Sequence, residues 1–268
     1  RGAPMGLVSL ILDGYSKLMR TCNERSPSDL TPLGASLQQS DTKALELIIG
    51  KTDVLMKFSA PEFSSVSPLY YAVFVRNLSK VSILLDAAAG VGLSSEEMTN
   101  FLEGKIQLST PLFLAVKEQY NEIALKLMQA GASFMGTGSS GMTVLHLAVT
   151  ESKNDSPSDI LKAMIRQVPP DSRPGILNST VDTEGNTVLH CSVELLYPRL
   201  SRYLMVQGAS ILTVNHSLRS PLMLALEKQA EGHQALDCLL DKVSEEWNCG
   251  MLQSMFVMGM GKEDHVRV

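Results

Sequence analysis

One short pattern recurs six times along this chain, and it constrains the fold more than any other feature of the sequence. Each copy has Ser or Thr, in most copies followed by Pro, then Leu, and a small residue three positions after the Leu. A hydroxyl residue before Pro is typical of a helix start, because the hydroxyl accepts hydrogen bonds from free backbone N–H groups and Pro fits the first turn. The copies begin at Thr31, Ser67, Thr110, Thr143, Thr187 and Ser220.

A second apolar segment with helical spacing follows each copy. These segments cover residues 44–49, 81–85, 124–128, 160–165, 200–205 and 235–240. A helix pair of this kind has apolar surface on two sides, and it buries that surface only by stacking on its neighbours. The recurrence, at intervals of 33 to 44 residues, therefore predicts a stacked array of helix pairs rather than the two ordinary domains that 268 residues would suggest.

The pattern resembles the ankyrin repeat, a 33-residue unit with the signature T-P-L-H-x-A. The resemblance covers residues 29–243 and implies an all-α ankyrin-repeat solenoid, in which about six helix-turn-helix repeats are joined by hairpins or loops. We expect residues 1–28 to form an N-terminal capping helix or a degenerate repeat. We expect residues 244–268 to form a C-terminal cap or a flexible tail.

Residues beyond the 33-residue unit predict three insertions, near 90–108, 152–158 and 168–181. The first contains residues 95–101, which have the composition of a short extra helix. The third contains Pro169, Pro170 and Pro174, which predict a rigid loop. Such loops allow a repeat protein to vary one surface without disturbing the stack.

The resemblance also implies a partner-binding surface, because ankyrin repeats typically bind proteins on a concave face made from hairpin fingers and first helices. The residue before each copy lies on a finger: Val66, Ser109, Met142, Asn186 and Arg219. The end of each first helix faces the groove: Phe74, Val75, Lys117, Glu118, Thr150, Glu151, Glu194, Leu195, Glu227 and Lys228.

Two interpretations stay open for this surface. Phe74 is either an exposed hydrophobic anchor for a partner or a residue that packs under the insertion near 90–104. The four glutamates Glu118, Glu151, Glu194 and Glu227 either attract a basic partner or form a solvated face. If both functional interpretations hold, the partner is a protein or peptide with a hydrophobic anchor and basic residues.

The motifs that suggest chemistry have structural explanations. Residues 136–141 match G-x-G-x-x-G, but they follow a predicted helix rather than a strand, which favours a hairpin between repeats over a dinucleotide site. His146 and His190 occupy the His position of the repeat signature. No cysteine pair has metal-ligand or redox spacing, and no positioned base accompanies a nucleophile. We therefore expect no catalytic residue, metal or cofactor.

Ser156 precedes Pro157 in the polar insertion 152–158. Together with Pro157 and Asp159 it fits a helix cap. It also fits a proline-directed phosphorylation site, and both roles stay open.

Charge and composition narrow the partner class. The net charge is −5 and no basic run is present, whereas direct binding to nucleic acid needs clustered Lys and Arg. The longest uncharged run, between Lys126 and Glu151, is interrupted by glycines and does not predict a membrane span. Four cysteines in 268 residues favour a reducing compartment, the cytoplasm or nucleus.

The sequence therefore predicts a non-catalytic protein–protein interaction module, an adaptor or an inhibitor resembling the NF-κB inhibitor family, that acts in signalling or transcriptional regulation. The alternative is an ankyrin region that recruits substrates or partners for a larger enzyme, channel or transcription factor. Fold class does not decide between them.

Overall fold

The computed structural model describes residues 31–106, 109–136, 138, 141–152, 155–179 and 182–230. The chain divides into two compact units, residues 1–148 and 149–268, and each is described by itself. The expected terminal segments 1–28 and 244–268 and the last expected helix, 235–240, lie outside the described residues.

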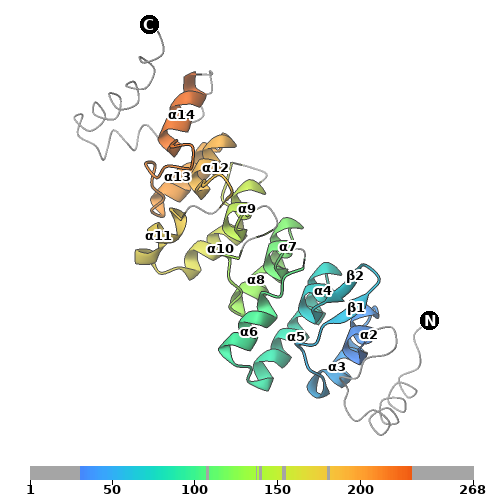
Figure 1. Cartoon of the computed structure of the whole chain (residues 1–268). Coiled ribbons are helices and arrows are strands. Elements are labelled where there is room, and N and C mark those ends of the chain that lie inside the picture. Colours follow the sequence, from blue (N-terminus) through green and yellow to red (C-terminus); the bar gives the residue numbers. More distant parts are fainter. Residues whose placement is uncertain are drawn as a thin grey trace. The chain divides into compact units, whose positions relative to one another are not determined.

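The first unit consists of consecutive helix pairs (Figure 1). Its elements are α2 (Pro32–Gln38), α3 (Lys43–Ile48), η1 (Ile49–Lys51), β1 (Phe58–Ala60), β2 (Phe63–Val66), α4 (Pro68–Phe74), α5 (Leu78–Val91), α6 (Ser95–Leu102), α7 (Pro111–Lys117), α8 (Asn121–Gln129) and the start of α9 (Val144–Thr150). The pairs are α2 with α3, α4 with α5, and α7 with α8. Because α4 contacts both α2 and α7, and α5 contacts both α3 and α8, the first helices form one layer and the second helices another.

The second unit continues the same plan. It contains the end of α9, then α10 (Asp159–Gln167), η2 (Pro170–Ser172), α11 (Arg173–Leu177), α12 (Val188–Glu194), α13 (Pro198–Val206) and α14 (Pro221–Ala230). Helix α12 packs against its partner α13 and against α14, the first helix of the next repeat.

The repeat signature forms helix starts and core, as the sequence predicts. The hydroxyls of Thr31, Ser67 and Thr110 accept hydrogen bonds from the backbone N–H three residues later, at 3.0, 3.3 and 3.1 Å. Every signature leucine is buried: Leu33, Leu69, Leu112, Leu145, Leu189 and Leu222. The small residues are buried too, which permits close approach of neighbouring helices.

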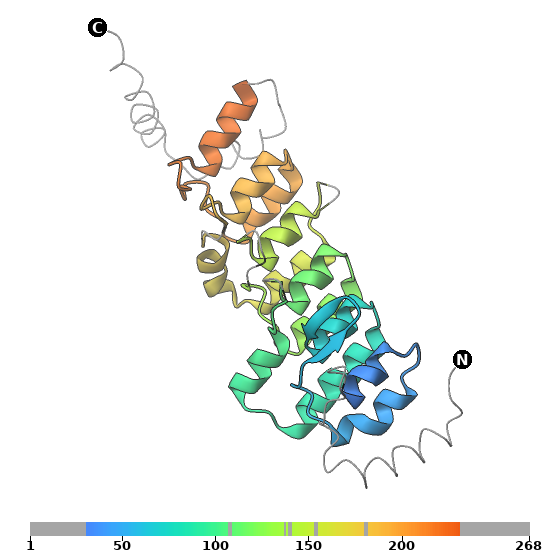
Figure 2. The same cartoon turned by 45° about the vertical axis from the view of Figure 1, so that its right-hand side comes forward.

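The finger that the resemblance implies before α4 is the hairpin β1–β2, although the sequence did not indicate its strands. Its two strands lie side by side (Figure 2). They pair antiparallel, with Phe58 opposite Val66. Strand β1 packs on α2, where the Phe58 ring lies directly against Gly34. Any Cβ at position 34 would collide with that ring, which explains why the first repeat has Gly after its leucine.

The insertions differ in how well the sequence described them. Helix α6, Ser95–Leu102, is present where a short helix was expected, and Ser94 and Glu97 cap it reciprocally. The expected rigid loop after α10 is instead the turn η2 and the short helix α11. Proline is compatible with the first turn of a helix, so Pro170 and Pro174 lie in the first turns of these elements rather than prevent them.

Candidate functional site: helix ends and hairpin fingers

In the first unit, an aromatic group lies where α4 ends. The Phe74 and Phe63 rings meet edge-on, with their centroids 5.0 Å apart. The tilted Tyr71 ring has its centroid 6.3 Å from that of Phe74. Phe63 also meets Tyr70 edge-on, with the centroids 5.9 Å apart. Phe74 is 39% exposed and Val75 is 37% exposed. We call Phe63, Phe74 and Val75 the aromatic shelf. The hairpin β1–β2 holds Phe74 from one side, because Phe63 belongs to β2, and leaves part of its ring in solvent.

The other predicted residues of the first unit are placed less uniformly. Lys117 and Glu118, at the end of α7, are exposed, whereas Ser109 and Met142 are half-buried. Val66 is fully buried at the end of β2, so its expected place on a partner-binding surface is corrected: its side chain packs in the core. Successive side chains of a strand point to opposite faces, and the last position of β2 places Val66 in the core.

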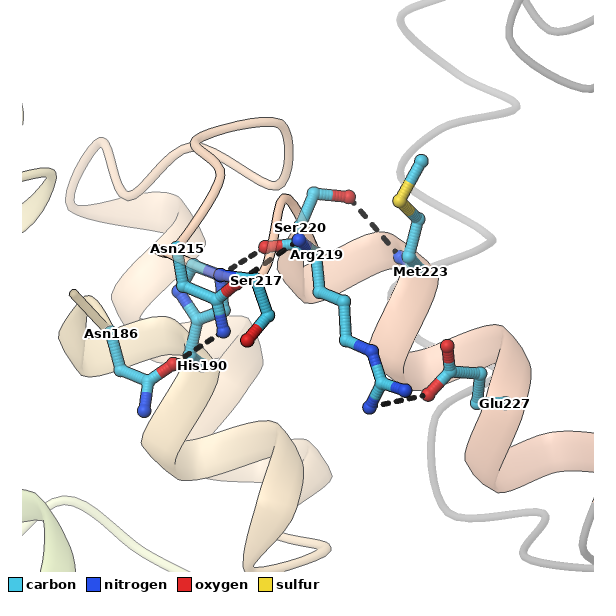
Figure 3. Close-up of polar contacts among 8 residues, drawn as sticks. All are labelled: Asn186, His190, Asn215, Ser217, Arg219, Ser220, Met223 and Glu227. Carbon is cyan, nitrogen blue, oxygen red and sulfur yellow. Dashed lines mark hydrogen bonds and ion pairs between the residues drawn. The ribbon is translucent and has the colours of Figure 1, made fainter. Parts of the chain in front are cut away.

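In the second unit, most of the predicted residues at the helix ends and on the last finger are charged, and most are exposed. Glu151, Glu194, Arg219 and Glu227 are exposed, Leu195 is 38% exposed, and Thr150 and Lys228 are half-buried. Arg219 pairs with Glu227, with Nη1 3.3 Å from the carboxylate oxygen (Figure 3). Partial burial raises the pKa of Glu194, and the neighbouring carboxylate of Glu184 raises it further. Negative charge therefore accumulates around Glu194.

The predicted finger residue Asn186 is buried, and this expectation is corrected as well. Its side-chain Oδ1 accepts a 2.8 Å hydrogen bond from Nδ2 of Asn215 in the next finger (Figure 3). Its own Nδ2 donates to Asp182 at 2.9 Å. Asn186 therefore joins two consecutive fingers, a role that its position in the sequence did not indicate.

His190 holds the same two repeats together. The backbone N–H of Thr187 donates to Nδ1 at 3.1 Å, so Nδ1 carries no proton and the imidazole is neutral. Its Nε2–H then donates to the carbonyl of Arg219 at 3.0 Å. Burial lowers the pKa of His190, which favours this neutral form. His146 begins the same motif, with Nδ1 2.8 Å from Thr143 Oγ1.

Leu218 is a surface feature that the sequence analysis did not identify. It lies at the tip of the finger before α14, is 63% exposed, and has φ +58°. Glycine occupies the equivalent position of two earlier fingers, with φ +73° at Gly141 and +74° at Gly185. Leu218 lies one 33-residue repeat after Gly185, so an alignment of the repeats could have shown that leucine stands there in place of glycine.

The remaining motifs gain structural explanations. Between α8 and α9, the backbone N–H of Gly138 donates to the carbonyl of Met142 at 2.9 Å, and that of Gly141 donates to the carbonyl of Gly138 at 3.1 Å, so these two glycines of the G-x-G-x-x-G match follow a helix rather than a strand. Burial raises the pKa of the Cys191 thiol to about 12, so it is a packed side chain rather than a thiolate. Among the described residues, no three His, Cys, Asp or Glu side chains gather as metal ligands. No helix in the described ranges is long and apolar enough to span a bilayer.

The comparisons with known proteins agree with this architecture. No family model matches the chain. The transient receptor potential cation channel subfamily A member 1 of Drosophila melanogaster is 28% identical over 137 residues, which are 51% of this chain. The match takes in 11% of the channel, so the chain spans about a tenth of the length of that curated relative.

A solved structure shows the fold. The ankyrin repeat domain of Bcl-3, described as a unique member of the IκB protein family, matches with a TM-score of 0.62. The match covers 87% of this chain and 90% of that domain, at 21% sequence identity. The fold is generally a non-enzymatic scaffold for protein interaction. The resemblance that the repeat signature carries is confirmed, and the chain is an ankyrin-repeat solenoid.

Proposed function

We propose that the chain is a non-catalytic recognition module, an adaptor or inhibitor in signalling or transcriptional regulation, that binds a protein or peptide through the concave face of its repeats. The observation that carries the proposal is the aromatic shelf of the first unit. Aromatic residues, Phe among them, are enriched at protein interfaces, where a few well-packed side chains carry most of the binding energy.

The geometry of the shelf favours a hydrophobic anchor on the partner. Phe74 is held by ring contacts to Phe63 and Tyr71, so little side-chain freedom remains to be lost on binding. Val75 extends the apolar surface beyond the end of α4. Lys117 and Glu118 are exposed at the end of α7, the first helix of the adjacent repeat, and supply polar contacts of either sign.

The second unit adds a separate charged surface. Exposed Glu194 lies among other carboxylates, and only part of this charge is balanced by Arg219 and Lys228. We infer that a partner of this unit has basic residues. We leave Val66 and Asn186 out of the proposed contacts because both are buried.

The test compares two truncations of exposed apolar side chains in the first unit. Phe74→Ala removes the shelf, whereas Val91→Ala removes a side chain that is 62% exposed on α5, away from the shelf. Wild type and both variants are immobilised on a support and incubated with native cell extract. The captured partners are then purified, and the affinity of each for the wild type and for both variants is measured. We expect Phe74→Ala to weaken binding by about tenfold or more and Val91→Ala to leave it unchanged.

Both variants must first melt like the wild type, because Phe74 also packs against Phe63. A folded Phe74→Ala variant that binds the partner within about twofold of wild type would refute the proposed anchor. A glutamate variant, Glu151→Lys, tests the charged surface of the second unit in the same assay.

The similarity to a channel favours a second candidate, an ankyrin region that recruits partners for a larger protein. It rests on the match to a relative of which the chain spans 11%. Sequencing the complete transcript tests it: a reading frame that continues into a catalytic, channel or DNA-binding domain supports this candidate. A frame confined to the repeats excludes it.

The proposal includes an intracellular location and no direct binding to nucleic acid. The net charge of −5 supports the second point, because phosphate contacts require clustered cations. A salt titration checks it: direct DNA binding would weaken steeply with added salt, and we expect no binding with such a dependence.

A further inference from the structure

Ser-Pro and Thr-Pro dipeptides occur at five places within the described residues, and four of them start repeats. These four are Thr31, Ser67, Thr110 and Ser220. All four are buried, and each hydroxyl accepts a hydrogen bond from the backbone three residues ahead. An enzyme that modifies the hydroxyl would first have to unwind the helix that it caps, so these sites are closed in the folded chain.

Ser156 is the exception. It lies in the connection between α9 and α10 and is exposed. The cap of α10 is Ser158, whose hydroxyl accepts from the backbone N–H of Leu161 at 3.2 Å. The sequence interpretation of Ser156 as the cap is therefore corrected by two positions. Within the described part of the chain, the Ser156 hydroxyl has no structural task that modification would disrupt.

The neighbouring residue connects this loop to the next repeat. One carboxylate oxygen of Asp155 accepts hydrogen bonds from the backbone N–H groups of Arg199 and Leu200, at 2.8 and 3.0 Å. These groups begin α13, which has Tyr197 before it and no side-chain cap from its own segment. Asp155 thus caps a helix that begins more than forty residues later in the chain.

We propose that Ser156 is a phosphorylation site for a proline-directed protein kinase, and that the phosphate is sensed at the start of α13 through the Asp155 cap. The kinase transfers the γ-phosphoryl group of ATP: an Oγ–P bond forms, the bond to ADP breaks, and the hydroxyl proton passes to the kinase's base. The product carries about −1.5 to −2 charges beside Asp155.

That charge acts on an electrostatically sensitive contact. A phosphate oxygen is a stronger hydrogen-bond acceptor than a neutral group, so it competes with Asp155 for the N–H donors of Arg199 and Leu200, and its negative charge repels the Asp155 carboxylate. The amides of Arg199 and Leu200 are at the positive end of α13, where added negative charge has its largest effect. The modification therefore changes the environment of these two amides without entering the core.

The first half of the proposal is tested by phosphate incorporation into the intact folded chain. The background carries Ser26→Ala, because Ser26-Pro27 is a further Ser-Pro site outside the described residues. A purified mitogen-activated protein kinase and ATP are added, and phosphorylated positions are mapped by mass spectrometry. We expect Ser156 to be modified at least about tenfold faster than each capping site, because those sites require local unfolding. Equal labelling of Thr31, Ser67, Thr110 or Ser220, or none at Ser156, overturns the proposal.

The second half is tested by nuclear magnetic resonance of the same sample. Phosphorylation should shift the backbone amide signals of Arg199 and Leu200 and leave those of Glu122 and Ile123, in the equivalent turn of α8, in place. Treatment of Ser156→Ala with kinase and ATP is the matched control and should shift neither pair. A phosphorylated Ser156 with unchanged Arg199 and Leu200 signals overturns the link to α13.

Discussion

The fingers 182–187 and 215–220 belong to consecutive repeats and follow the same hydrogen-bonding plan. In the first, an oxygen of Asp182 accepts from the backbone N–H groups of Glu184 and Asn186, at 3.0 and 2.6 Å. In the second, Asn215 Oδ1 accepts from Ser217 and Arg219, both at 3.0 Å (Figure 3). Asp and Asn are equivalent for the turn itself, because it needs only one side-chain oxygen acceptor, whereas only Asn can also donate to the neighbouring finger.

The fingers differ at their fourth position, where the first has Gly185 and the second Leu218. Both residues adopt the left-handed conformation, with φ +74° and +58°. At Gly185 the ring of His216 from the next finger lies so close that an added Cβ would be 2.6 Å from it. Leu218 instead extends 63% into solvent. Position 185 therefore requires glycine both because its backbone is left-handed and because no side chain fits beside His216. Position 218 has the same left-handed backbone but has room for a side chain in solvent.

Gly185→Leu is the strongest test of this difference. The left-handed conformation costs a leucine about 1–2 kcal/mol, and overpacking against His216 adds about 1–3 kcal/mol. We expect a loss of about 2–5 kcal/mol in urea unfolding followed by circular dichroism. His216→Ala in the same background should recover the steric part only. A variant as stable as wild type would show that the fingers have no such contact.

Asn215→Ala breaks the second finger and its link to the first. It leaves the amides of Ser217 and Arg219 without their acceptor and removes the bond to Asn186. We expect a loss of about 2–3 kcal/mol in the same measurement. Asn215→Asp keeps the acceptor that Asp182 provides in the first finger and should lose less. Equal losses would mean that the link to Asn186, rather than the turn, carries the effect.

Acidification should weaken the hydrogen bond that His190 makes to the carbonyl of Arg219 in the next repeat. Burial lowers the pKa of His190 in the folded chain, so below about pH 6.5 the unfolded chain binds more protons than the folded one. The contribution of His190 to the free energy of unfolding is therefore fully present above that pH. It decreases as the pH falls, by at most about 1.4 kcal/mol per pH unit for one proton.

Urea unfolding between pH 7.5 and 5.5 measures this dependence, with His190→Asn as the control. The difference between the two proteins removes the contribution of Glu194, whose raised pKa acts in the opposite direction. An identical pH dependence in both proteins would contradict the neutral, buried imidazole.

Leu218→Gly should give the smallest change, and in the stabilising direction. It relieves the left-handed strain at an exposed position, against the entropy of a glycine in the unfolded chain, for a net gain of about 0.5–1 kcal/mol. The thermal midpoint measures it, with Leu218→Asn, which also tolerates this conformation, as the matched variant. A loss of stability would show that the exposed side chain contributes packing.

Much of the fold could be predicted because its determinants are close together in sequence. A cap such as Thr110 acts on Phe113, three residues away, and the signature leucines recur in phase with the helices. The aromatic shelf was anticipated only at Phe74 and Val75. Its other member, Phe63, belongs to a hairpin whose short strands carry few residues and little periodic signal.

The sequence alone determined the repeats, because hydroxyl caps, prolines and apolar spacing act within one or two helical turns. Only the tertiary structure decided which side chains the stack removes from solvent and which it joins. His190 bonds to Arg219 at a separation of 29 residues, and Asp155 bonds to Arg199 at 44. Contacts of that range depend on how neighbouring repeats pack, because no local preference of the chain brings such distant groups within hydrogen-bonding distance.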